Sequence, residues 1–220
     1  MSRTALVAGA SGLVGGEVVR LLLADDAYDR VTMFVRKELP LAHRKLTQRV
    51  VAFDRLEEVS DFPRVNDVFC CLGTTLRLAG SQKAFRKVDF TYVVALARVA
   101  SRNRAGHFLV VTALGADRQS RIFYNRVKGE VEQAVRREAF DSLSIFRPSL
   151  LVGERAERRP GERVAVLLSP LISWAMVGPL RRYRPIPAAT VARAMVRIAR
   201  EAPRGVHVYP SDEIAELGRF

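Results

Sequence analysis

The sequence predicts an α/β fold with a doubly wound parallel sheet and a small carboxyl-terminal part that shapes a substrate pocket. Three observations support this prediction. Short apolar segments alternate with helical ones, several of the apolar segments are apolar on both faces, and a glycine-rich turn joins the first segment to the first helix. Strands that are apolar throughout are typical of parallel sheets covered on both faces, and strand–helix alternation is typical of α/β domains.

The expected elements follow from the apolar patterns along the chain. Helical spacing of Val14, Val18, Leu21 and Leu22 places the first helix directly after the glycine-rich turn. We expect strands at Thr4–Ala8, Val31–Val35, Arg49–Phe53, Asp67–Leu72, Phe108–Thr112 and Leu143–Phe146, and helices at Leu13–Ala24, Ala84–Ser101, Asn125–Glu138 and Thr190–Arg200. We expect residues 1–153 to form the core, and residues 154–220 to form a segment that packs on this core within a single domain.

Composition restricts the class of protein. A chain of 220 residues with 49% hydrophobic and 27% charged residues is an ordinary globular domain, not a disordered, collagen-like or coiled-coil chain. The two cysteines, Cys70 and Cys71, are adjacent, so no disulfide framework is expected. A reducing compartment, most simply the cytoplasm, follows as the expected location. The three histidines are far apart and have no ligand-spaced partners, so no metal site is expected.

The net charge of +13 does not by itself predict a nucleic-acid partner. Arginine accounts for 31 of the 36 basic residues, and these residues are spread over both halves of the chain. No specific nucleic-acid binding is expected, and an anionic small molecule explains the charge equally well. The longest uncharged run, Val164–Leu180, is short for a membrane span of about 20 residues. We expect it to cover a pocket or form a dimer surface, with peripheral membrane contact as the alternative, and the chain to be a monomer or homodimer.

A glycine-rich turn of spacing G-x-x-G-x-x-G lies between the first strand and the first helix. The first glycine permits the tight turn, the second lets the backbone approach a phosphate, and the third lets the helix pack closely on the sheet. The free N–H groups of the helix start then bind the anion. The alternative, a turn without ligand, explains less of this context. The sequence therefore predicts a Rossmann-type phosphate site at Gly9, Ala10, Ser11, Gly12, Leu13, Val14 and Gly15.

Residues after the next three strands indicate which cofactor fits. Arg36 and Lys37 follow the second strand, where an acidic residue would bind a ribose 2′-hydroxyl. Two cations suit a 2′-phosphate, so the sequence favours NADP(H) over NAD(H), with a solvated charge pair as the alternative. Phe53 and Asp54 end the third strand, where an adenine can lie. Gly73, Thr74 and Thr75 follow the fourth strand and can contact ribose or phosphate.

Tyr124 and Lys128 are four residues apart on an expected helix, so they share one face. A nearby ammonium stabilises a phenolate, and a phenol tuned in this way can exchange a proton with a carbinol or carbonyl oxygen. Thr112 ends the fifth expected strand, and its hydroxyl can polarise a substrate carbonyl. The alternatives are a surface helix pair for Tyr124 and Lys128 and a turn-capping hydroxyl for Thr112.

Taken together, these residues resemble the short-chain dehydrogenase/reductase superfamily in its extended or atypical branch. More narrowly, the chain looks like the family of the human Tat-interacting-protein oxidoreductase and its bacterial relatives. The segments that resemble this family are GASGLVGG, FCCLGTT, KVDF, YNRVKGEVE, FRPSLLVG and TVARAM. The sequence differs from the superfamily pattern in two places: Thr112 replaces the commoner serine, and Lys87 stands where many extended members have an asparagine.

The resemblance implies an NADPH site and a catalytic triad of Thr112, Tyr124 and Lys128. The implied cofactor contacts include the segment Pro148–Leu151, with Pro148, Leu150 and Leu151, in addition to Tyr124 and Lys128. The remaining implied contacts are Ser11, Gly12, Leu13, Val14, Arg36, Lys37, Leu72, Gly73 and Thr74.

Two functions remain open at this point. The first is an NADP-dependent reductase or dehydrogenase that acts on a small-molecule carbonyl or carbinol. The second is an NADP(H)-responsive regulatory or binding protein without turnover, suggested by the charged loop Glu154–Arg163 and the cluster Arg181, Arg182 and Arg184.

Overall fold

A single parallel sheet forms the centre of the computed structural model, which describes residues 2–153 and 178–219. Its seven strands follow the order β3-β2-β1-β4-β5-β6-β9. The strand bounds are β1 Arg3–Ala8, β2 Tyr28–Val35, β3 Leu46–Val50, β4 Asp67–Cys70, β5 His107–Val111, β6 Ser142–Arg147 and β9 Gly205–Pro210. The predicted doubly wound, Rossmann-type α/β fold is confirmed.

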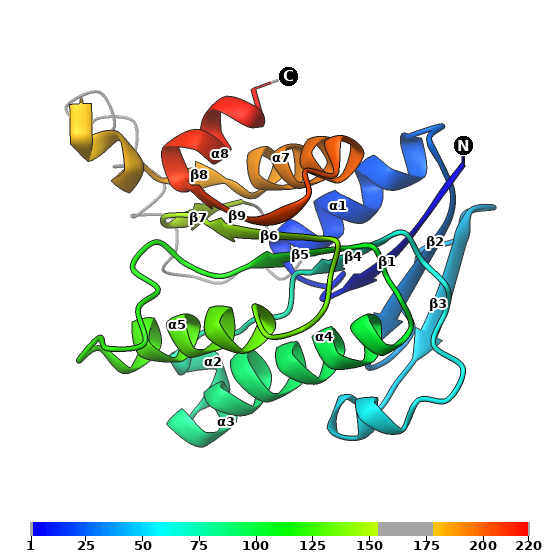
Figure 1. Cartoon of the computed structure of the whole chain (residues 1–220), viewed down its shortest axis with the longest axis horizontal. Coiled ribbons are helices and arrows are strands. Elements are labelled where there is room, and N and C mark those ends of the chain that lie inside the picture. The colour runs from blue at the N-terminus through cyan, green and yellow to red at the C-terminus, as the bar shows by residue number, and fades with distance from the viewer. Residues whose placement is uncertain (1, 154–177, 220) are drawn as a thin grey trace.

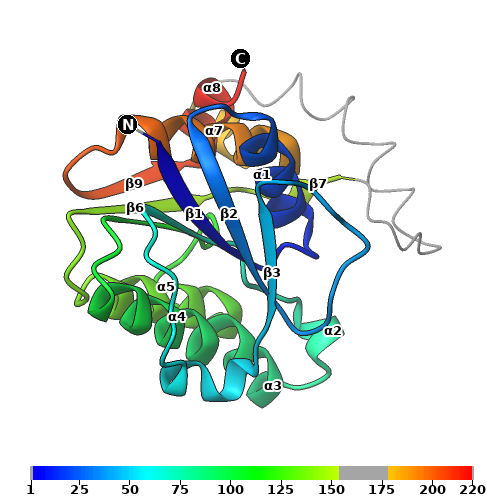
Figure 2. The ribbon, with the colours of Figure 1, turned by 90° about the vertical axis from the view of Figure 1, so that its right-hand side faces the viewer.

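Helices cover both faces of the sheet (Figures 1 and 2). On one face lie α1 (Leu13–Ala24), α7 (Ala188–Glu201) and α8 (Ser211–Leu217), and on the other lie α4 (Tyr92–Arg102) and α5 (Phe123–Val135). Alternate side chains of each strand therefore enter different cores. Phe108 and Val110 of β5 pack toward α4 and α5, whereas Leu109 packs toward α1 and α7. Burial of a side chain of this size contributes about 1.5–3 kcal/mol, and the both-faced apolar strands supply many such contacts.

Short elements connect the layers at the carboxyl edge of the sheet. A 3₁₀ turn at Phe53–Glu58 follows β3, and α2 (Leu76–Ala79) and α3 (Gln82–Arg86) follow β4. A π-helical turn, Lys87–Thr91, then leads into α4. Another 3₁₀ turn, Gly178–Tyr183, precedes α7. After β6, β7 (Leu151–Val152) pairs in parallel with β8 (Ile186–Pro187).

The structure differs from the expected elements in three places. The third strand is Leu46–Val50 instead of Arg49–Phe53, because Phe53 begins the 3₁₀ turn. The expected helix at Ala84–Ser101 is divided among α3, the π-helical turn and α4. The strand β9 and the helix α8 were not expected, and β9 adds the carboxyl-terminal segment to the main sheet as an edge strand beside β6. The charged loop 154–163, the uncharged run up to residue 177 and Trp174 lie outside the described residues.

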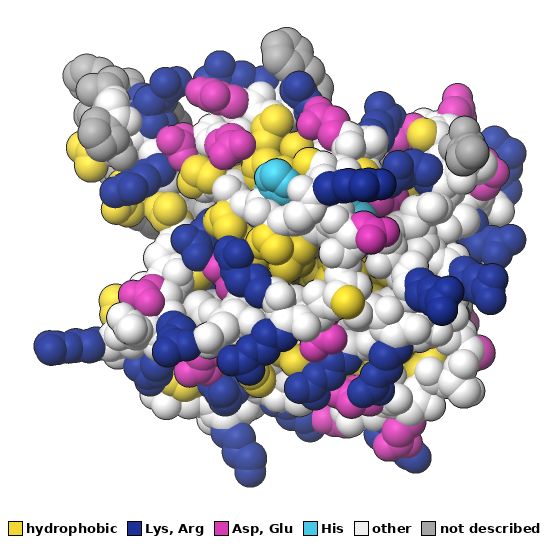
Figure 3. Space-filling view, viewed as in Figure 1, with side chains coloured by type: hydrophobic (Ala, Val, Ile, Leu, Met, Phe, Trp, Pro, Cys, Tyr) yellow, Lys and Arg dark blue, Asp and Glu magenta, His cyan; other side chains and the backbone are white. Residues whose placement is uncertain are grey.

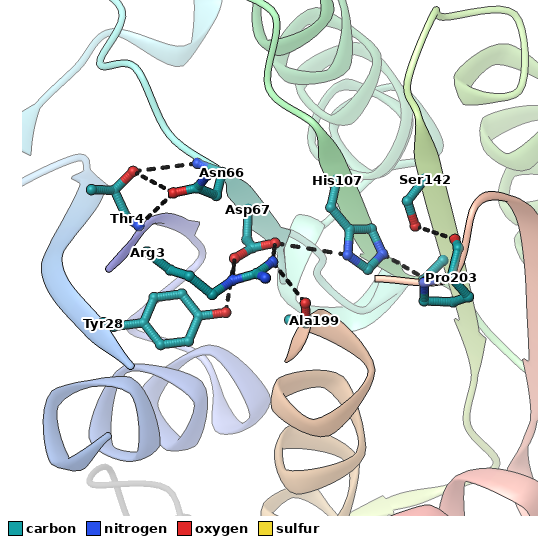
Figure 4. A network of polar contacts seen from close by, with 10 residues as sticks. Arg3, Thr4, Tyr28, Asn66, Asp67, His107, Ser142, Ala199 and Pro203 are labelled. Carbon is teal, nitrogen blue, oxygen red and sulfur yellow. Dashed lines mark hydrogen bonds and ion pairs between the residues drawn. The ribbon is translucent and has the colours of Figure 1, made fainter. Parts of the chain in front are cut away.

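A buried polar network closes the amino edge of the sheet (Figure 4). Asp67, at the start of β4, is fully buried and accepts hydrogen bonds from Arg3 Nε at 3.0 Å, Arg3 Nη2 at 2.7 Å and the Tyr28 hydroxyl at 2.8 Å. Arg3 Nη2 also donates to the Ala199 carbonyl at 2.8 Å, which ties α7 to this edge. His107 Nδ1 lies 3.7 Å from Asp67 Oδ1, and its Nε2 contacts Ser144 Oγ at 2.9 Å. Protein groups alone satisfy the carboxylate here.

Among residues 2–153 and 178–219, no helix combines the length and the apolar character that a membrane span requires.

Candidate active site

The glycine-rich turn lies at the carboxyl end of β1, where its glycines are sterically required. Gly9 has a φ of +92°, and a Cβ atom on it would lie 2.4 Å from the Cys71 carbonyl oxygen. A Cβ on Gly15 would lie 2.2 Å from the Gly9 carbonyl oxygen. The helix α1 begins after Gly12 without a side-chain cap and without an acidic residue in its first turn. Its first N–H groups therefore remain available to an anion.

Arg36 and Lys37 lie beside this turn. The register pairs Ala8 of β1 with Phe34 of β2, so the two cations follow at the edge where the glycine-rich turn begins. Both side chains are exposed, and in the described part of the chain neither forms an ion pair. They are placed to meet an anion next to the phosphate-binding turn.

Phe53 and Asp54 lie farther out along the same edge. The Phe53 ring packs against Tyr92 with a centroid distance of 5.6 Å. Asp54 accepts a hydrogen bond from the Tyr92 hydroxyl at 3.0 Å and pairs with Lys87 Nζ at 2.6 Å. The hydrogen bond from Lys87 holds the pKa of Asp54 below its usual value. Lys87, which replaces the asparagine of many extended members, is thus engaged by Asp54.

The segment after β4 meets α5 through a buried ion pair. Asp89, on the π-helical turn, is fully buried, and its Oδ1 lies 2.7 Å from Lys128 Nζ, which is also buried. Asp89 Oδ2 accepts the backbone N–H of Thr74 at 2.8 Å. A Cβ on Gly73 would lie 3.4 Å from Asp89 Oδ1 and 3.7 Å from Lys128 Nζ. The segment 72–75 therefore lies against a charged pair. Within this segment Gly73 and Thr75 are exposed, and Leu72 and Thr74 are half-buried.

Lys128 remains an ammonium in this position. Burial alone would lower its pKa, but the carboxylate of Asp89 and the neighbouring Tyr124 outweigh burial and raise the pKa above its usual value. The buried thiol of Cys70 lies on the same side, and burial raises the pKa of this thiol to about 12, so it stays neutral. Asp89 is therefore the fixed negative charge facing Lys128.

Tyr124 lies half-exposed at the first turn of α5, one turn before Lys128. Its ring contacts the buried Phe85 at a centroid distance of 5.5 Å, and Lys128 Nζ lies 5.9 Å from the ring centroid. Gly129 lets α5 approach the preceding loop, because a Cβ there would lie 2.2 Å from the Arg118 backbone nitrogen. This close approach fixes the start of α5, and with it the position of Tyr124.

Thr112 directly follows β5, and its side chain is buried against α5. Its hydroxyl lies 2.7 Å from Glu132 Oε1, to which it donates, and 3.3 Å from the Phe146 carbonyl oxygen. Glu132 is in turn bound by Arg147 through Nε at 2.9 Å and Nη2 at 2.5 Å. The sequence predicts that this hydroxyl orients a substrate oxygen, whereas in the structure it is bound to Glu132.

The segment Pro148–Leu151 connects the sheet edge with the carboxyl-terminal part. The Pro148 carbonyl accepts from Leu114 N at 2.8 Å, and the Leu150 carbonyl accepts from Ile186 N at 2.9 Å. Leu150 is 62% exposed. Gly153, just after this segment, approaches the glycine-rich turn, since a Cβ there would lie 3.3 Å from Leu13 Cδ2.

A cavity of about 350 Å³ lies next to this segment, between β8, α7 and α8. Arginines line much of it, and Ser211 connects it to the edge of β6 by accepting from Ser149 N at 3.1 Å. Its arginine lining comprises Arg181, Arg184, Arg193 and Arg219. Figure 3 shows the molecule hollowed on the left side of the view, between the part that carries β8 and α8 and the part that carries α5.

The structure therefore brings most of the predicted site to one edge of the sheet. Five of its parts follow the carboxyl ends of strands: the glycine-rich turn, residues 36–37, residues 72–75, the start of α5 and residues 148–151. Sequence reasoning missed Asp89, Glu132 and Phe85. Glu132 carried a signal, because it is one helical turn beyond Lys128. Asp89 lies in the KVDF segment of the family resemblance, but its pairing with Lys128 arises only through folding.

Comparison with known proteins agrees with this geometry. A family model described as NAD(P)H-binding matches residues 9–202. The chain belongs to this NAD(P)H-binding family. It is 37% identical over 201 residues to protein HTATIP2 of Rattus norvegicus, covering 89% of this chain and 80% of that protein. It is 32% identical over 173 residues to the mitochondrial protein fmp52 of Emericella nidulans, covering 75% of this chain and 73% of the relative. The match to protein HTATIP2 and the NAD(P)H-binding family model confirm the predicted resemblance to the Tat-interacting-protein family.

Solved structures confirm the fold. The Bordetella bronchiseptica enzyme WbmH in complex with NAD⁺ matches with a TM-score of 0.71 at 14% identity, covering 96% of this chain and 76% of that structure. MoeE5 in complex with UDP-glucose and NAD matches with a TM-score of 0.69 at 15% identity, covering 98% of this chain and 80% of that chain. The NAD(P)H-binding family match supports a nicotinamide cofactor, and these solved structures confirm the Rossmann-type fold.

One expectation is corrected by the comparisons. The fungal relatives of Emericella nidulans, Coccidioides immitis and Eremothecium gossypii are named as mitochondrial proteins. The prediction of a cytoplasmic location, which depended only on the two unpaired cysteines, is therefore wrong. Reduced cysteines are equally compatible with other compartments that keep thiols reduced.

In the described residues, no cluster of three or more histidine, cysteine or acidic side chains has the spacing of a metal site.

Proposed function

We propose that the protein is an NADP-dependent oxidoreductase that interconverts a carbonyl and a carbinol on a small molecule. The observation that carries the proposal is the juxtaposition of Tyr124, Lys128 and Asp89 with the Gly73–Thr74 backbone, at the sheet edge that also holds the glycine-rich turn. The turn fits a dinucleotide, because a Cβ on Gly9 or Gly15 would clash with a backbone carbonyl oxygen. Only glycine at these two positions permits the tight turn that lets the backbone approach a phosphate. Bound there, a nicotinamide supplies or accepts the hydride.

Binding and specificity belong to the chain's cationic and backbone groups. The N–H groups at the start of α1 hold the pyrophosphate, and the exposed Arg36 and Lys37 hold a 2′-phosphate, which gives the preference for NADP(H). Phe53 and Asp54 border the adenine. Residues 72–75 and Pro148–Leu151 would contact the remainder of the cofactor, and Leu150 is exposed for such a contact.

Proton transfer is assigned to Tyr124. Tyr124 is half-exposed at the first turn of α5, so its phenol can donate a proton to a carbonyl oxygen or take one from a carbinol. Lys128 supplies a permanent positive charge beside it and can donate to ribose hydroxyls. Thr112 is the third member of the proposed triad. To orient the substrate oxygen, its hydroxyl must give up the 2.7 Å hydrogen bond to Glu132.

We assign the substrate pocket to the carboxyl-terminal segment, residues 154–220. Its described part, residues 178–219, packs on the core through α7, β9 and α8. We propose a small-molecule carbonyl substrate and no specific nucleic acid. Basic and acidic side chains are interspersed over the face shown in Figure 3, without one continuous basic surface. The chain acts as a monomer or homodimer, and peripheral membrane contact is the less favoured alternative.

One observation favours a second function. Because Thr112 is bound to Glu132, the site holds one phenol and no free hydroxyl from Thr112 to orient a substrate. An NADP(H)-responsive regulatory or binding protein needs the cofactor groups but not that hydroxyl. Under this function, NADPH changes the affinity for a partner and no hydride transfer takes place.

Two experiments test the proposal. Calorimetry with NADPH and NADH should show tighter binding of NADPH, and the preference should disappear in Arg36→Ala. A panel of carbonyl compounds should then reveal NADPH oxidation that Tyr124→Phe abolishes while NADPH still binds. Full turnover in Tyr124→Phe on an identified substrate would refute the assigned mechanism. Cofactor binding without turnover on any compound of the panel would favour the regulatory function.

A further inference from the structure

The ion pair beneath the Gly73–Thr74 segment joins three parts of the chain that are distant in sequence. Asp89 comes from the π-helical turn before α4, Lys128 from α5, and Thr74 from the segment after β4. One carboxylate therefore contacts the ammonium through Oδ1 at 2.7 Å and the backbone N–H through Oδ2 at 2.8 Å. Both Asp89 and Lys128 are buried, at 0% and 5% exposure.

This burial makes the pairing obligatory. An isolated buried charge is strongly unfavourable, so each group stabilises the charged form of the other. No second cation faces Asp89 among the described contacts. Lys87, only two residues earlier in the sequence, pairs instead with Asp54 at 2.6 Å. The groups around the pair are Tyr124 on α5 and the neutral Cys70 thiol on β4.

We infer that Asp89 is a positioning residue, whose carboxylate fixes the Lys128 ammonium and the Gly73–Thr74 backbone relative to one another. This inference deepens the proposed function, on which its catalytic part depends. Lys128 Nζ forms an ion pair with Asp89 Oδ1 at 2.7 Å, and its ammonium, which has three N–H donors, can also donate to a ribose or to the phenol of Tyr124.

The backbone contact gives Asp89 a second consequence. Gly73 is exposed and has no side chain of its own to hold it, so the hydrogen bond to Thr74 N–H anchors the segment from below. A π-helical turn adds one residue to the helix, and such insertions are found frequently at functional sites. Here the insertion carries the carboxylate that reaches both groups.

The test is Asp89→Asn, with Asp25→Asn as the matched control. Asp25 is also buried, accepts a backbone N–H from Ala27 at 3.0 Å, and pairs with Arg200 through Oδ2 at 2.5 Å, outside the proposed site. The lysine signals of ¹³C-lysine-labelled protein report ionisation without turnover, and the chain has only five lysines. In Asp89→Asn we expect the Lys128 signal to titrate at least about one pH unit lower, because burial is then no longer opposed.

NADPH binding is the second readout. Asp89→Asn should weaken it about tenfold, as expected for the loss of one charged hydrogen bond and the loosening of the segment. Asp89→Glu keeps the charge but adds a methylene, so Lys128 should stay ionised while NADPH binding still weakens. Asp25→Asn should change neither readout. If turnover is found, the pH–rate profile of Asp89→Asn should shift toward lower pH.

The outcomes separate this inference from the proposed function. Unchanged Lys128 titration and unchanged NADPH affinity in folded Asp89→Asn would overturn the inference. Failure of wild-type protein to bind NADPH would overturn the proposed function, while the lysine titration still decides the positioning role. If the variants do not fold, amide exchange in the wild-type protein decides: the Thr74 N–H should exchange much more slowly than that of the exposed Thr75, and equal rates would contradict the inference.

Discussion

The two edges of the sheet are built around the same kind of charge pair but use it differently. At the amino edge, Asp67 is surrounded by Arg3, Tyr28 and His107, and every oxygen is satisfied by side chains. At the carboxyl edge, Asp89 pairs with Lys128 through one oxygen and accepts the backbone N–H of Thr74 with the other. The carboxylate of Asp67 therefore stabilises the fold, whereas the carboxylate of Asp89 supports a backbone segment that faces solvent.

This difference shows where binding can occur in a doubly wound fold. Parallel strands bring their carboxyl ends to one edge, where the connecting loops carry glycines and free N–H groups. The amino edge has the more extensive polar network, yet protein groups already satisfy both oxygens of Asp67, and Arg3 also donates to the Ala199 carbonyl of α7. A polar cluster indicates a ligand site only when some of its hydrogen-bonding capacity remains unused. Four changes test this contrast.

Asp67→Ala should have the largest effect on stability. Removing the carboxylate leaves Arg3 and the Tyr28 hydroxyl without their partner, and loss of one member of a buried ion pair costs about 3–5 kcal/mol. Urea unfolding measures the loss. NADPH affinity, measured below the unfolding transition, should stay the same. A weakened affinity would show that the amino edge also takes part in binding.

Gly9→Ala should destabilise the protein by about 3 kcal/mol and also weaken NADPH binding. The substitution adds a Cβ 2.4 Å from the Cys71 carbonyl oxygen at a φ of +92°. Gly80→Ala is the matched control, since Gly80 also has a positive φ of +75° but no atom lies within 4 Å of its Cβ position. Equal unfolding free energies for the two variants would mean that close approach of the β4 segment does not constrain Gly9.

Acid should destabilise the protein through His107 by about 2 kcal/mol between pH 8 and pH 5. Burial, aided by the nearby Arg3 charge, lowers the pKa of His107 from 6.5 to about 4. The unfolded chain therefore binds the proton more readily, so the stabilising contribution is complete above about pH 6.5 and is lost as the pH falls toward 4. His107→Gln stays neutral and should remove this part of the pH dependence. An identical pH dependence in His107→Gln and wild type would contradict the assignment.

Thr112→Val should have the smallest effect on the fold, about 1 kcal/mol, because it removes one buried hydrogen bond to Glu132 but keeps the shape of the side chain. Its effect on activity is the informative part. If Thr112 orients the substrate oxygen, turnover should fall at least about tenfold while NADPH affinity is unchanged. Unaltered turnover would limit Thr112 to holding Glu132 and Arg147 in place.

The sequence predicted the features that depend on local patterns. The helix α1, Leu13–Ala24, matches the expected range because the glycine-rich turn sets its start and its apolar residues recur at helical spacing. The third strand was expected three residues too late, because Val50 and Phe53 are both apolar and only the turn after the strand separates them. The strand β9 was missed because GVHVYP begins with glycine and ends with proline, which masks its short apolar alternation.

Features that depend on contacts between distant residues could not be predicted. Nothing near Asp89 in sequence indicates that it lies under Thr74 and against Lys128, 39 residues away. The orientation of Thr112 toward Glu132 likewise depends on the side of β5 that α5 covers. The prediction of a cytoplasmic location failed for a different reason. Unpaired cysteines indicate reducing conditions, and more than one compartment provides them.

Hydrogen–deuterium exchange with and without NADPH tests the contrast between the two edges most directly. We predict that NADPH slows amide exchange at the carboxyl edge, in residues 9–15, 72–75 and 148–151. Exchange around Arg3, Asp67 and His107 at the amino edge should be the same in both conditions. Protection confined to the amino edge, or no change anywhere at saturating NADPH, would contradict the account.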